Sequence, residues 1–251
     1  MAIHCQTPDA EPTTCCVRAR CGRLRVVRGS GSMTNVLETD YLLVGAGASG
    51  MAFADSIITS SDVDVVIVDR RHAPGGHWND TYPFIRLHQP SAYYGVNSLP
   101  LGRDTIDVSG VNAGMYERAS GHELCAYYER VMSDRLLPSG RVRFFPYCEY
   151  TREGQLVSLL TGQSTEIGAR KAVVDATYLE PTVPATSAPP FEVGDGVRCV
   201  PVNELARVPE PPDDFVIIGA GKTGADAILH LLDNGVPQHR SGGSSPAKPG
   251  T

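Results

Sequence analysis

The chain has 251 residues, 41% of them hydrophobic and 20% charged, which is enough for one large or two small folded domains. Its formal net charge of −6 argues against a nucleic-acid partner held through phosphate contacts. No apolar run approaches the roughly 18 residues that a membrane-spanning helix needs, so the sequence predicts a cytoplasmic protein without a membrane span.

Residues 1–32 differ from the rest of the chain, with five arginines, few acidic residues and no sustained periodicity. A transit peptide and a disordered basic tail both fit this composition. We favour a third interpretation, an extension without a structural role, because Met33 stands just before the first predicted strand. Four of the seven cysteines lie here, but they lack the C-x-x-C spacing of a zinc site, and no secretory segment precedes them.

The next segment has the pattern of a βαβ unit. An apolar strand over 41–44 leads into Gly45-Ala-Gly47-Ala-Ser-Gly50, a helix is expected over 47–60, and a second strand is expected over 63–68. In such a G-x-G-x-x-G loop the first glycine permits a tight turn, the second lets the backbone approach a pyrophosphate, and the third lets the helix pack on the strand. The free amides of the helix N-terminus attract phosphate. The spacing therefore predicts a dinucleotide site.

Asp69 follows the second predicted strand, 24 positions after Gly45. A carboxylate at this place accepts hydrogen bonds from a ribose 2′-hydroxyl and repels a 2′-phosphate. The site is therefore expected to bind FAD or NAD and not NADP. A chance turn is the alternative for an isolated glycine motif, but here the strand, the helix and the acid all have the expected spacing.

The remainder of the chain divides into several further segments. Residues 71–115 read as ordered loop, and the period of the apolar residues predicts a helix over 122–137. The apolar stretches at 141–150, 156–161 and 172–176 predict an antiparallel meander followed by a return strand. A proline-rich connection leads to a second strand, glycine loop and helix over 215–232. The polar, glycine- and serine-rich end, 237–251, reads as a disordered tail.

Directly after Asp69 comes Arg70-Arg-His-Ala-Pro-Gly-Gly76-His77-Trp78. This segment resembles the flavin-containing monooxygenases and their Baeyer–Villiger relatives, in which an acid followed by Gly-Gly-x-Trp ends the first βαβ unit. The 174 positions between Gly45 and Gly219, and the pair Ala176-Thr177, are also similar to these families. The motif and the resemblance together assign an FAD site to Gly45, Gly47, Ala48, Ser49, Gly50, Asp69, Arg70, Gly76, His77 and Trp78. A packing role is the alternative for Trp78.

The resemblance further implies that the segment after Trp78 runs past the flavin ring. Arg86 could stabilise an anionic reduced flavin or a flavin peroxide, and His88 could relay a proton. Both are therefore candidate catalytic residues. The alternative is that these side chains only hold a loop together by hydrogen bonds.

The second glycine loop runs from Gly219 to Gly224 and has the same G-x-G-x-x-G form. By resemblance it is expected to receive the pyrophosphate of NADPH through Gly219, Gly221, Lys222, Thr223 and Gly224, with a solvated lysine as the alternative for Lys222. A triphosphate P-loop is rejected, because that motif needs a glycine where Val216 stands. No apolar strand follows the helix, so the sequence predicts that this second unit is incomplete.

These features predict an α/β fold, with a Rossmann-type FAD-binding domain of parallel sheet plus antiparallel meander and the start of a second Rossmann-type NAD(P)-binding domain. The expected boundaries are an extension over 1–32, the FAD domain over 33–180, a linker and partial NAD(P) domain over 181–236, and the tail over 237–251. The chain is interpreted as a truncated member of the family it resembles.

The function implied by the resemblance is an FAD-dependent monooxygenase, in which NADPH reduces the flavin and a flavin peroxide oxygenates a small organic substrate. The histidine-containing Baeyer–Villiger fingerprint is not found between the two loops, which puts ketone oxygenation in doubt. The main alternative is a non-catalytic flavin-binding remnant. A dithiol reductase would need two neighbouring cysteines in the FAD domain, but no cysteine lies between Cys21 and Cys125. A plain NAD-dependent dehydrogenase leaves the second loop unexplained. The sequence leaves open whether the chain forms a homo-oligomer.

Overall fold

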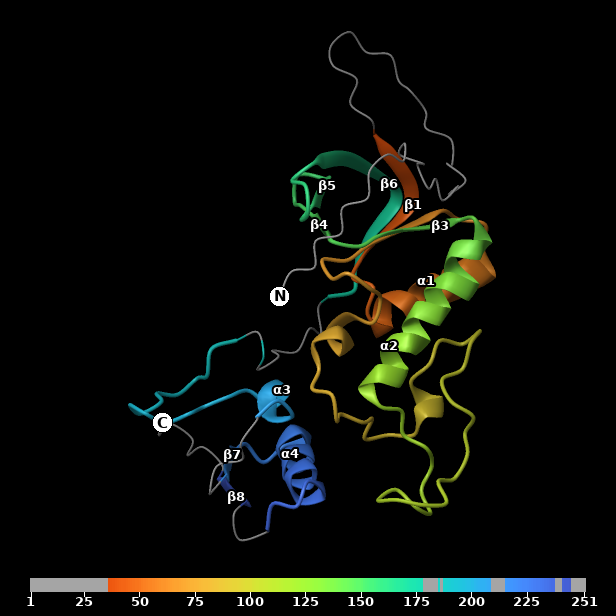
Figure 1. Cartoon of the computed structure of the whole chain (residues 1–251). Coiled ribbons are helices and arrows are strands. Elements are labelled where there is room, and N and C mark those ends of the chain that lie inside the picture. Colours follow the sequence, from red (N-terminus) through yellow and green to blue (C-terminus); the bar gives the residue numbers. More distant parts are fainter. Residues whose placement is uncertain (1–35, 178–184, 186, 209–214, 238–240, 245–251) are drawn as a thin grey trace, which may run out of the picture.

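A twisted sheet with helices on one face and a small meander on the other forms the larger part of the structure (Figure 1). This computed structural model describes residues 36–177, 185, 187–208, 215–237 and, for the backbone alone, 241–244. The predicted extension over 1–32 and the tail residues 245–251 lie outside the described residues.

The sheet has six strands in the order β3-β2-β1-β6-β5-β4. Strands β1, β2, β3 and β6 pair in parallel, whereas β4, β5 and the first part of β6 form the antiparallel meander. The strand bounds are β1 Leu37–Val44, β2 Val65–Val68, β3 Val142–Phe145, β4 Cys148–Tyr150, β5 Gln155–Ser158 and β6 Ser164–Asp175. The parallel sheet, the meander and the return strand were all predicted from the sequence.

One strand prediction is wrong. Residues 141–150 were expected as a single strand of the meander, but they form two strands with different partners. β3 extends the parallel sheet beside β2, and β4 begins the meander. Between them lies a turn at Pro146 and Tyr147, and Tyr147 has a φ of 52°. Because apolar side chains flank this turn on both sides, hydrophobic periodicity alone does not reveal that the strand is interrupted.

The sheet is covered on both faces, and this explains the unbroken apolar sequence of β2. Val65 and Ile67 pack into the core under the helices, whereas Val66 and Val68 pack with Leu156 into the smaller core under the meander. A parallel strand with two covered faces reads as a continuous apolar run for this reason. Alternate side chains of β2 therefore belong to two separate cores, one on each face of the sheet.

Two helical segments cover one face of the sheet. α1 spans Ala48–Ser60, as predicted. α2 spans Gly121–Arg130 and continues through a π-helical turn, Val131–Leu136, and a 3₁₀ turn, Leu137–Ser139, where the sequence predicted one regular helix. A capping box starts α2, because the Ser120 hydroxyl accepts from the amide of Glu123 and the Glu123 carboxylate accepts from that of Ser120.

A buried carboxylate ties α1 to this second helical segment. Asp55 is only 1% exposed, and it accepts hydrogen bonds from the Ser98 amide at 3.0 Å, from the Ser98 hydroxyl and from Arg135 Nε at 3.2 Å. Arg135 in turn donates to Thr59 at 2.7 Å. These contacts join three segments that are distant in the sequence.

We expect Asp55→Ala to lower the free energy of unfolding by about 3 kcal/mol, because removing one partner of a buried ion pair leaves the other donors unsatisfied. Urea unfolding followed by circular dichroism measures this change. Asp62→Ala is the matched control, since the Asp62 side chain is fully exposed and pairs with Arg141 only at 3.6 Å. Equal losses in the two variants would contradict a special role of Asp55.

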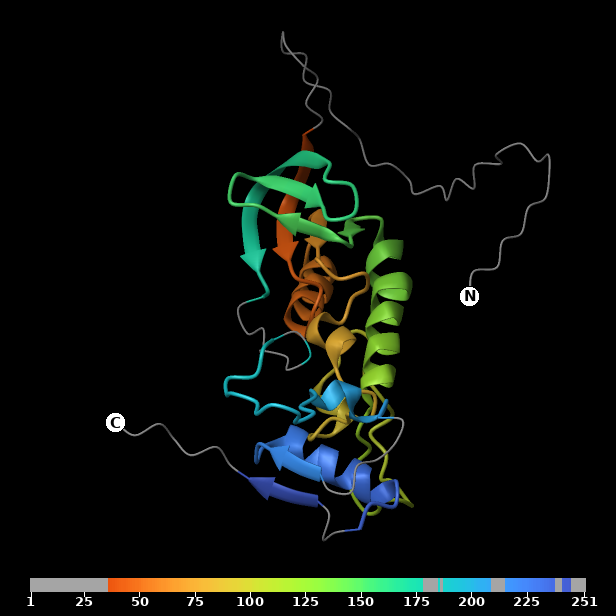
Figure 2. The same cartoon turned by 60° about the vertical axis from the view of Figure 1, so that its left-hand side comes forward.

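The second glycine loop belongs to a smaller unit at the lower end of the molecule (Figure 2). It comprises α3 Val202–Leu205, β7 Phe215–Ile218, α4 Lys222–Asp233 and β8 Ser241–Ser244. β8 pairs in parallel with β7, so a strand does follow the helix. The expectation of a disordered tail is wrong for 241–244, because strand pairing uses backbone groups and a Ser-Gly-Gly-Ser strand carries no apolar signal.

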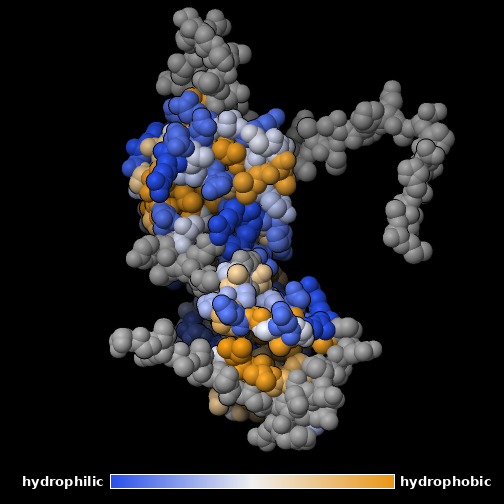
Figure 3. Space-filling view, turned by 90° about the vertical axis from the view of Figure 1, so that its left-hand side faces the viewer, coloured by the Kyte–Doolittle hydropathy of each residue, from blue (hydrophilic) through white to orange (hydrophobic). Residues whose placement is uncertain are grey.

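The surface of this smaller unit is partly apolar. Val216 and Ile218, which alternate outward on β7, are 72% and 49% exposed. Figure 3 shows apolar patches both on this lower part and on the sheet-containing part above it. Across the residues that the structure describes, no helix combines the length and apolar character required to span a membrane.

Candidate functional site

The first glycine loop has the geometry that its sequence predicts. Gly45 leaves β1 with a φ of 108°, a conformation that favours glycine. A side chain at Gly50 would place its Cβ 2.0 Å from the carbonyl oxygen of Gly45, so only glycine allows α1 to start this close to the strand. α1 has no side-chain cap at Gly47 and no acidic residue in its first turn, which leaves its first amides for an external acceptor.

A cavity of about 360 Å³ lies at this loop, and we call it the loop cavity. It brings together eight of the ten residues assigned to the FAD site; the two that do not line it are Gly50 and Trp78. The eight are Gly45, Gly47, Ala48, Ser49, Asp69, Arg70, Gly76 and His77. The glycine motif, the acid and the Gly-Gly-x-Trp segment therefore converge on one space.

Asp69 lies at the wall of the loop cavity and is only 5% exposed. Its Oδ2 atom accepts a hydrogen bond of 2.7 Å from the Ala46 amide, and its Oδ1 atom accepts one of 2.8 Å from the Arg71 amide. Each carboxylate oxygen keeps a further lone pair. Asp69 therefore holds the glycine loop in place and can still accept a hydroxyl from a ligand.

The Gly75–Gly76 turn closes against the glycine loop. The Gly75 amide donates to the Ala46 carbonyl at 2.8 Å, and a Cβ at Gly76 would stand 2.9 Å from the Cα of Gly47. Both residues have positive φ angles, 117° and 58°. The glycines of this turn are needed for backbone packing on the loop as well as for any ligand.

Trp78 does not line the loop cavity, although it was expected to hold FAD. It is 8% exposed, and its indole Nε1 donates to the Tyr94 hydroxyl at 2.8 Å with the two rings edge to face. Tyr94 does line the cavity. Burial raises the pKa of the Tyr94 hydroxyl, and the Trp78 hydrogen bond partly offsets this. Trp78 therefore contacts the cavity through Tyr94, the residue that its indole group holds in place.

The sequence interpretation missed several cavity residues. They are Tyr94 from the loop and Cys148, Glu149 and Tyr150 from β4. Burial raises the pKa of the Cys148 thiol. Nothing in the local sequence marks these residues. β4 lies at the cavity because the Cys148 amide donates to the Asp69 carbonyl at 3.0 Å. Ala176 and Thr177, which the resemblance did single out, also line the cavity and contact the position of a Cβ at Gly45.

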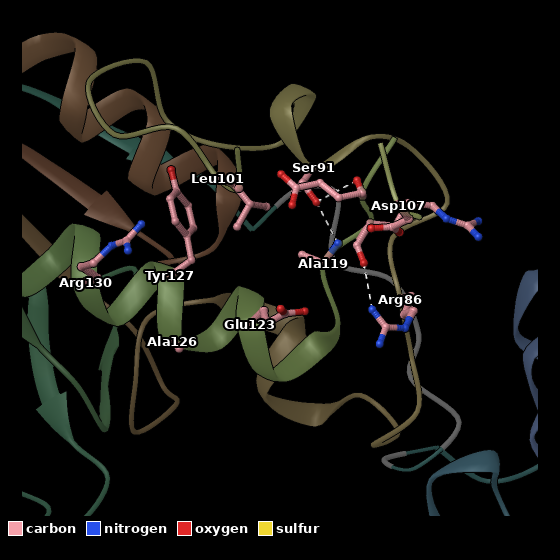
Figure 4. A pocket seen from close by; sticks show the side chains of 12 residues that line it. Arg86, Ser91, Leu101, Asp107, Ala119, Glu123, Ala126, Tyr127 and Arg130 are labelled. Atoms are coloured by element: carbon pink, nitrogen blue, oxygen red, sulfur yellow. Dashed lines mark hydrogen bonds between the residues drawn. The ribbon is translucent and has the colours of Figure 1, made fainter. Parts of the chain in front are cut away.

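The structure does not bring Arg86 and His88 to the loop cavity. Arg86 lines a separate cavity of about 460 Å³ beside α2, and its Nη1 atom donates to the Arg118 carbonyl at 3.1 Å (Figure 4). His88 is exposed and lines neither cavity. Their predicted position beside a flavin ring therefore has no counterpart in the geometry of the loop cavity.

The second glycine loop repeats the backbone geometry of the first. Gly219 has a φ of 130°, and a Cβ at Gly224 would stand 2.4 Å from the Gly219 carbonyl oxygen. α4 also begins without a side-chain cap and without an acid in its first turn. Gly221 and Thr223 are exposed, whereas the ammonium of Lys222 is bonded to the Asp226 carboxylate. Lys222 thus forms an ion pair within α4 at the position where the sequence predicts a phosphate contact.

The two glycine loops are connected through one short segment. The Asp80 backbone carbonyl accepts a hydrogen bond of 2.7 Å from Asn203 Nδ2. The Tyr82 hydroxyl donates to Asp226 at 2.6 Å, and the ring of Phe84 stacks on His230 at 4.0 Å. This segment directly follows the Gly76–Asp80 turn of the loop cavity. The second unit is therefore fixed to the part of the chain that shapes the first site.

The loop cavity fits the adenosine diphosphate part of a dinucleotide. The uncapped amides of α1 suit a pyrophosphate, and the buried carboxylate of Asp69 suits a ribose hydroxyl. The residues present therefore match the chemistry that FAD and NAD share, as the sequence motif implies.

Comparison with known proteins agrees with this geometry. The family described as an NAD(P)-binding Rossmann-like domain matches residues 43–102, which include the glycine loop and the acid. A flavin monooxygenase from Stenotrophomonas maltophilia, solved as a double mutant, superimposes with a TM-score of 0.56 at 19% identity, over 85% of this chain and 59% of that one. This likeness establishes a shared fold.

Curated relatives come from mycobacteria. Uncharacterised proteins of Mycobacterium bovis and Mycobacterium tuberculosis are each 50% identical to this chain over 200 residues. The match covers 80% of this chain and 37% of each relative, so the chain spans little more than a third of their length.

Proposed function

We propose that this chain, which contains a Rossmann-like domain and shares the fold of flavin monooxygenases, binds FAD in the loop cavity and acts as an NAD(P)H-using oxidoreductase. The observation that supports FAD most strongly is the convergence of uncapped helix amides and the buried Asp69 carboxylate on one cavity. FAD, when bound, supplies hydride acceptance and reaction with oxygen.

In this proposal the protein residues bind and orient the cofactor. The amides of Ala48 and Ser49, at the start of α1, donate to the pyrophosphate. Asp69 accepts a hydrogen bond from a ribose hydroxyl. Tyr94, whose hydroxyl accepts a hydrogen bond from Trp78, forms part of the cavity wall. The proposed FAD domain, 33–180, thus binds the cofactor largely with backbone groups.

The second loop is proposed to bind NADPH, in the partial NAD(P) domain of the segment 181–236. Its support is the repeated loop geometry at Gly219 and Gly224, and the short β7-α4-β8 unit around it. The substrate class we propose is a small organic molecule that is oxygenated at the flavin. Arg86 and His88 can take part in the reaction only if the reacting part of the cofactor or the substrate lies outside the loop cavity.

The separation of Arg86 and His88 from the loop cavity favours a second candidate, a flavin-binding protein without oxygenation activity. The two candidates make the same prediction for FAD binding. They differ in whether NADPH reduces the flavin and whether oxygen then oxidises a substrate.

The test is to purify the full chain, record its visible spectrum and add NADPH without oxygen. We expect flavin absorbance between about 370 and 450 nm, as flavin cofactors carry the redox chemistry of such proteins, and bleaching on addition of NADPH. Flavin absorbance without bleaching supports the second candidate. A colourless protein that does not take up added FAD overturns both.

A further inference from the structure

A hydrogen-bonded triad at the start of α4 links the two glycine loops. The Asp226 Oδ2 atom accepts from the Tyr82 hydroxyl at 2.6 Å and also from the Lys222 ammonium. Tyr82 is 144 positions away from Asp226 in the sequence and 5% exposed. Burial and the neighbouring carboxylate raise the pKa of Tyr82, so its hydroxyl stays protonated and acts as a donor.

Lys222 is the first residue of α4 and directly follows Gly221, the second glycine of the loop. Its ammonium is therefore attached at the helix end where an anion is favoured by the free amides. In the structure that ammonium is engaged by Asp226, whose side chain is 18% exposed. A phosphate at this helix end has to compete with Asp226 for the lysine.

Releasing Lys222 would normally be costly, because it leaves a partly buried carboxylate without its counter-ion. Here Tyr82 donates to the same oxygen atom, and its buried ring, which is 5% exposed, restricts its movement if the lysine leaves. A carboxylate that keeps a short hydrogen bond to a fixed donor loses less of its stabilisation. The Tyr82 hydroxyl thus makes a change of partner by Lys222 less costly.

We propose that Tyr82 and Asp226 set the dinucleotide affinity of the second glycine loop: Asp226 competes with a ligand phosphate for Lys222, and Tyr82 is a positioning residue that retains Asp226 when Lys222 moves to that phosphate. This inference rests on the proposed function of the second loop. It adds that Tyr82, in the segment after the Gly76–Asp80 turn, controls nucleotide affinity at the second glycine loop.

The proposal makes opposite predictions for two variants of the full chain. Tyr82→Phe removes the donor that remains for Asp226, so NADP⁺ binding weakens about tenfold, the effect of losing one hydrogen bond to a charged group. Asp226→Asn removes the competitor for Lys222, so NADP⁺ binding tightens about threefold, as for a partly exposed charge pair. In the double variant position 226 carries no carboxylate, so the loss of the Tyr82 hydroxyl has no further effect and the affinity equals that of Asp226→Asn.

The measurement is calorimetric titration of each FAD-loaded variant with NADP⁺, together with the FAD dissociation constant of each. Tyr93→Phe is the control for Tyr82, because the Tyr93 side chain is 77% exposed. Asp233→Asn, at the last residue of α4, is the control for the charge change. Neither control is expected to alter NADP⁺ affinity, and none of the variants is expected to alter FAD affinity.

The outcomes separate this inference from the proposed function. If both Tyr82→Phe and Asp226→Asn weaken NADP⁺ binding equally, the residues only support the fold and the inference is overturned. Wild-type protein that binds FAD but not NADP⁺ also overturns it, while the FAD site stands. Wild-type protein that takes up no FAD rejects the proposed function itself.

Discussion

Gly50→Ala is expected to lower the free energy of unfolding by about 3 kcal/mol, the upper part of the range for overpacking a tight site. The added methyl group would stand 2.0 Å from the carbonyl oxygen of Gly45, and that oxygen belongs to backbone that cannot rotate away. α1 has to move off the strand, which displaces the amides that line the loop cavity. We therefore also expect the variant to be purified without flavin.

Gly168→Ala is the matched control for this substitution. Gly168 lies in β6 of the same sheet, and a Cβ there would meet nothing within 4 Å. We expect a change within about 0.5 kcal/mol, as for substitutions away from packed features, and full retention of flavin. Urea unfolding and the ratio of flavin to protein absorbance measure both effects. Retained flavin in Gly50→Ala would show that the loop does not hold the cofactor.

Asp69→Asn is expected to weaken FAD binding about 100-fold, equivalent to about 2.7 kcal/mol. The carboxylate accepts from the amides of Ala46 and Arg71 with separate oxygen atoms. Asparagine offers one oxygen and one NH₂ group, so one of these amides loses its acceptor. The negative charge that a ribose hydroxyl would bond to is removed as well.

Asp64→Asn serves as the control for the change at Asp69. Asp64 precedes β2 and pairs with Arg170 at 3.5 Å, with half of its side chain exposed. We expect unchanged FAD affinity in this variant. The measurement is fluorescence quenching of FAD on titration with apoprotein. Equal FAD affinities for wild type and Asp69→Asn would contradict the proposed contact between Asp69 and the cofactor.

The sequence itself determined the first βαβ unit. Each of its signals is local: the apolar strand, three glycines with fixed spacing, a helix period and an acid at the end of the next strand. The structure adds that the third glycine faces the carbonyl oxygen of the first in both loops, at Gly50 and at Gly224. The spacing of the motif already encodes this contact, because the turn and the first helical turn fix it.

Tertiary structure alone decided which side chains share a cavity with that loop. Tyr94 and Cys148 line it from segments whose local sequence carries no ligand signal, whereas Trp78, which looked like a ligand residue, packs beneath Tyr94. β8 was missed because backbone pairing needs no apolar side chains. The Tyr82–Asp226 contact joins residues 144 positions apart. Such contacts depend on how distant segments pack against each other, and the spacing of residues along the chain does not predict that packing.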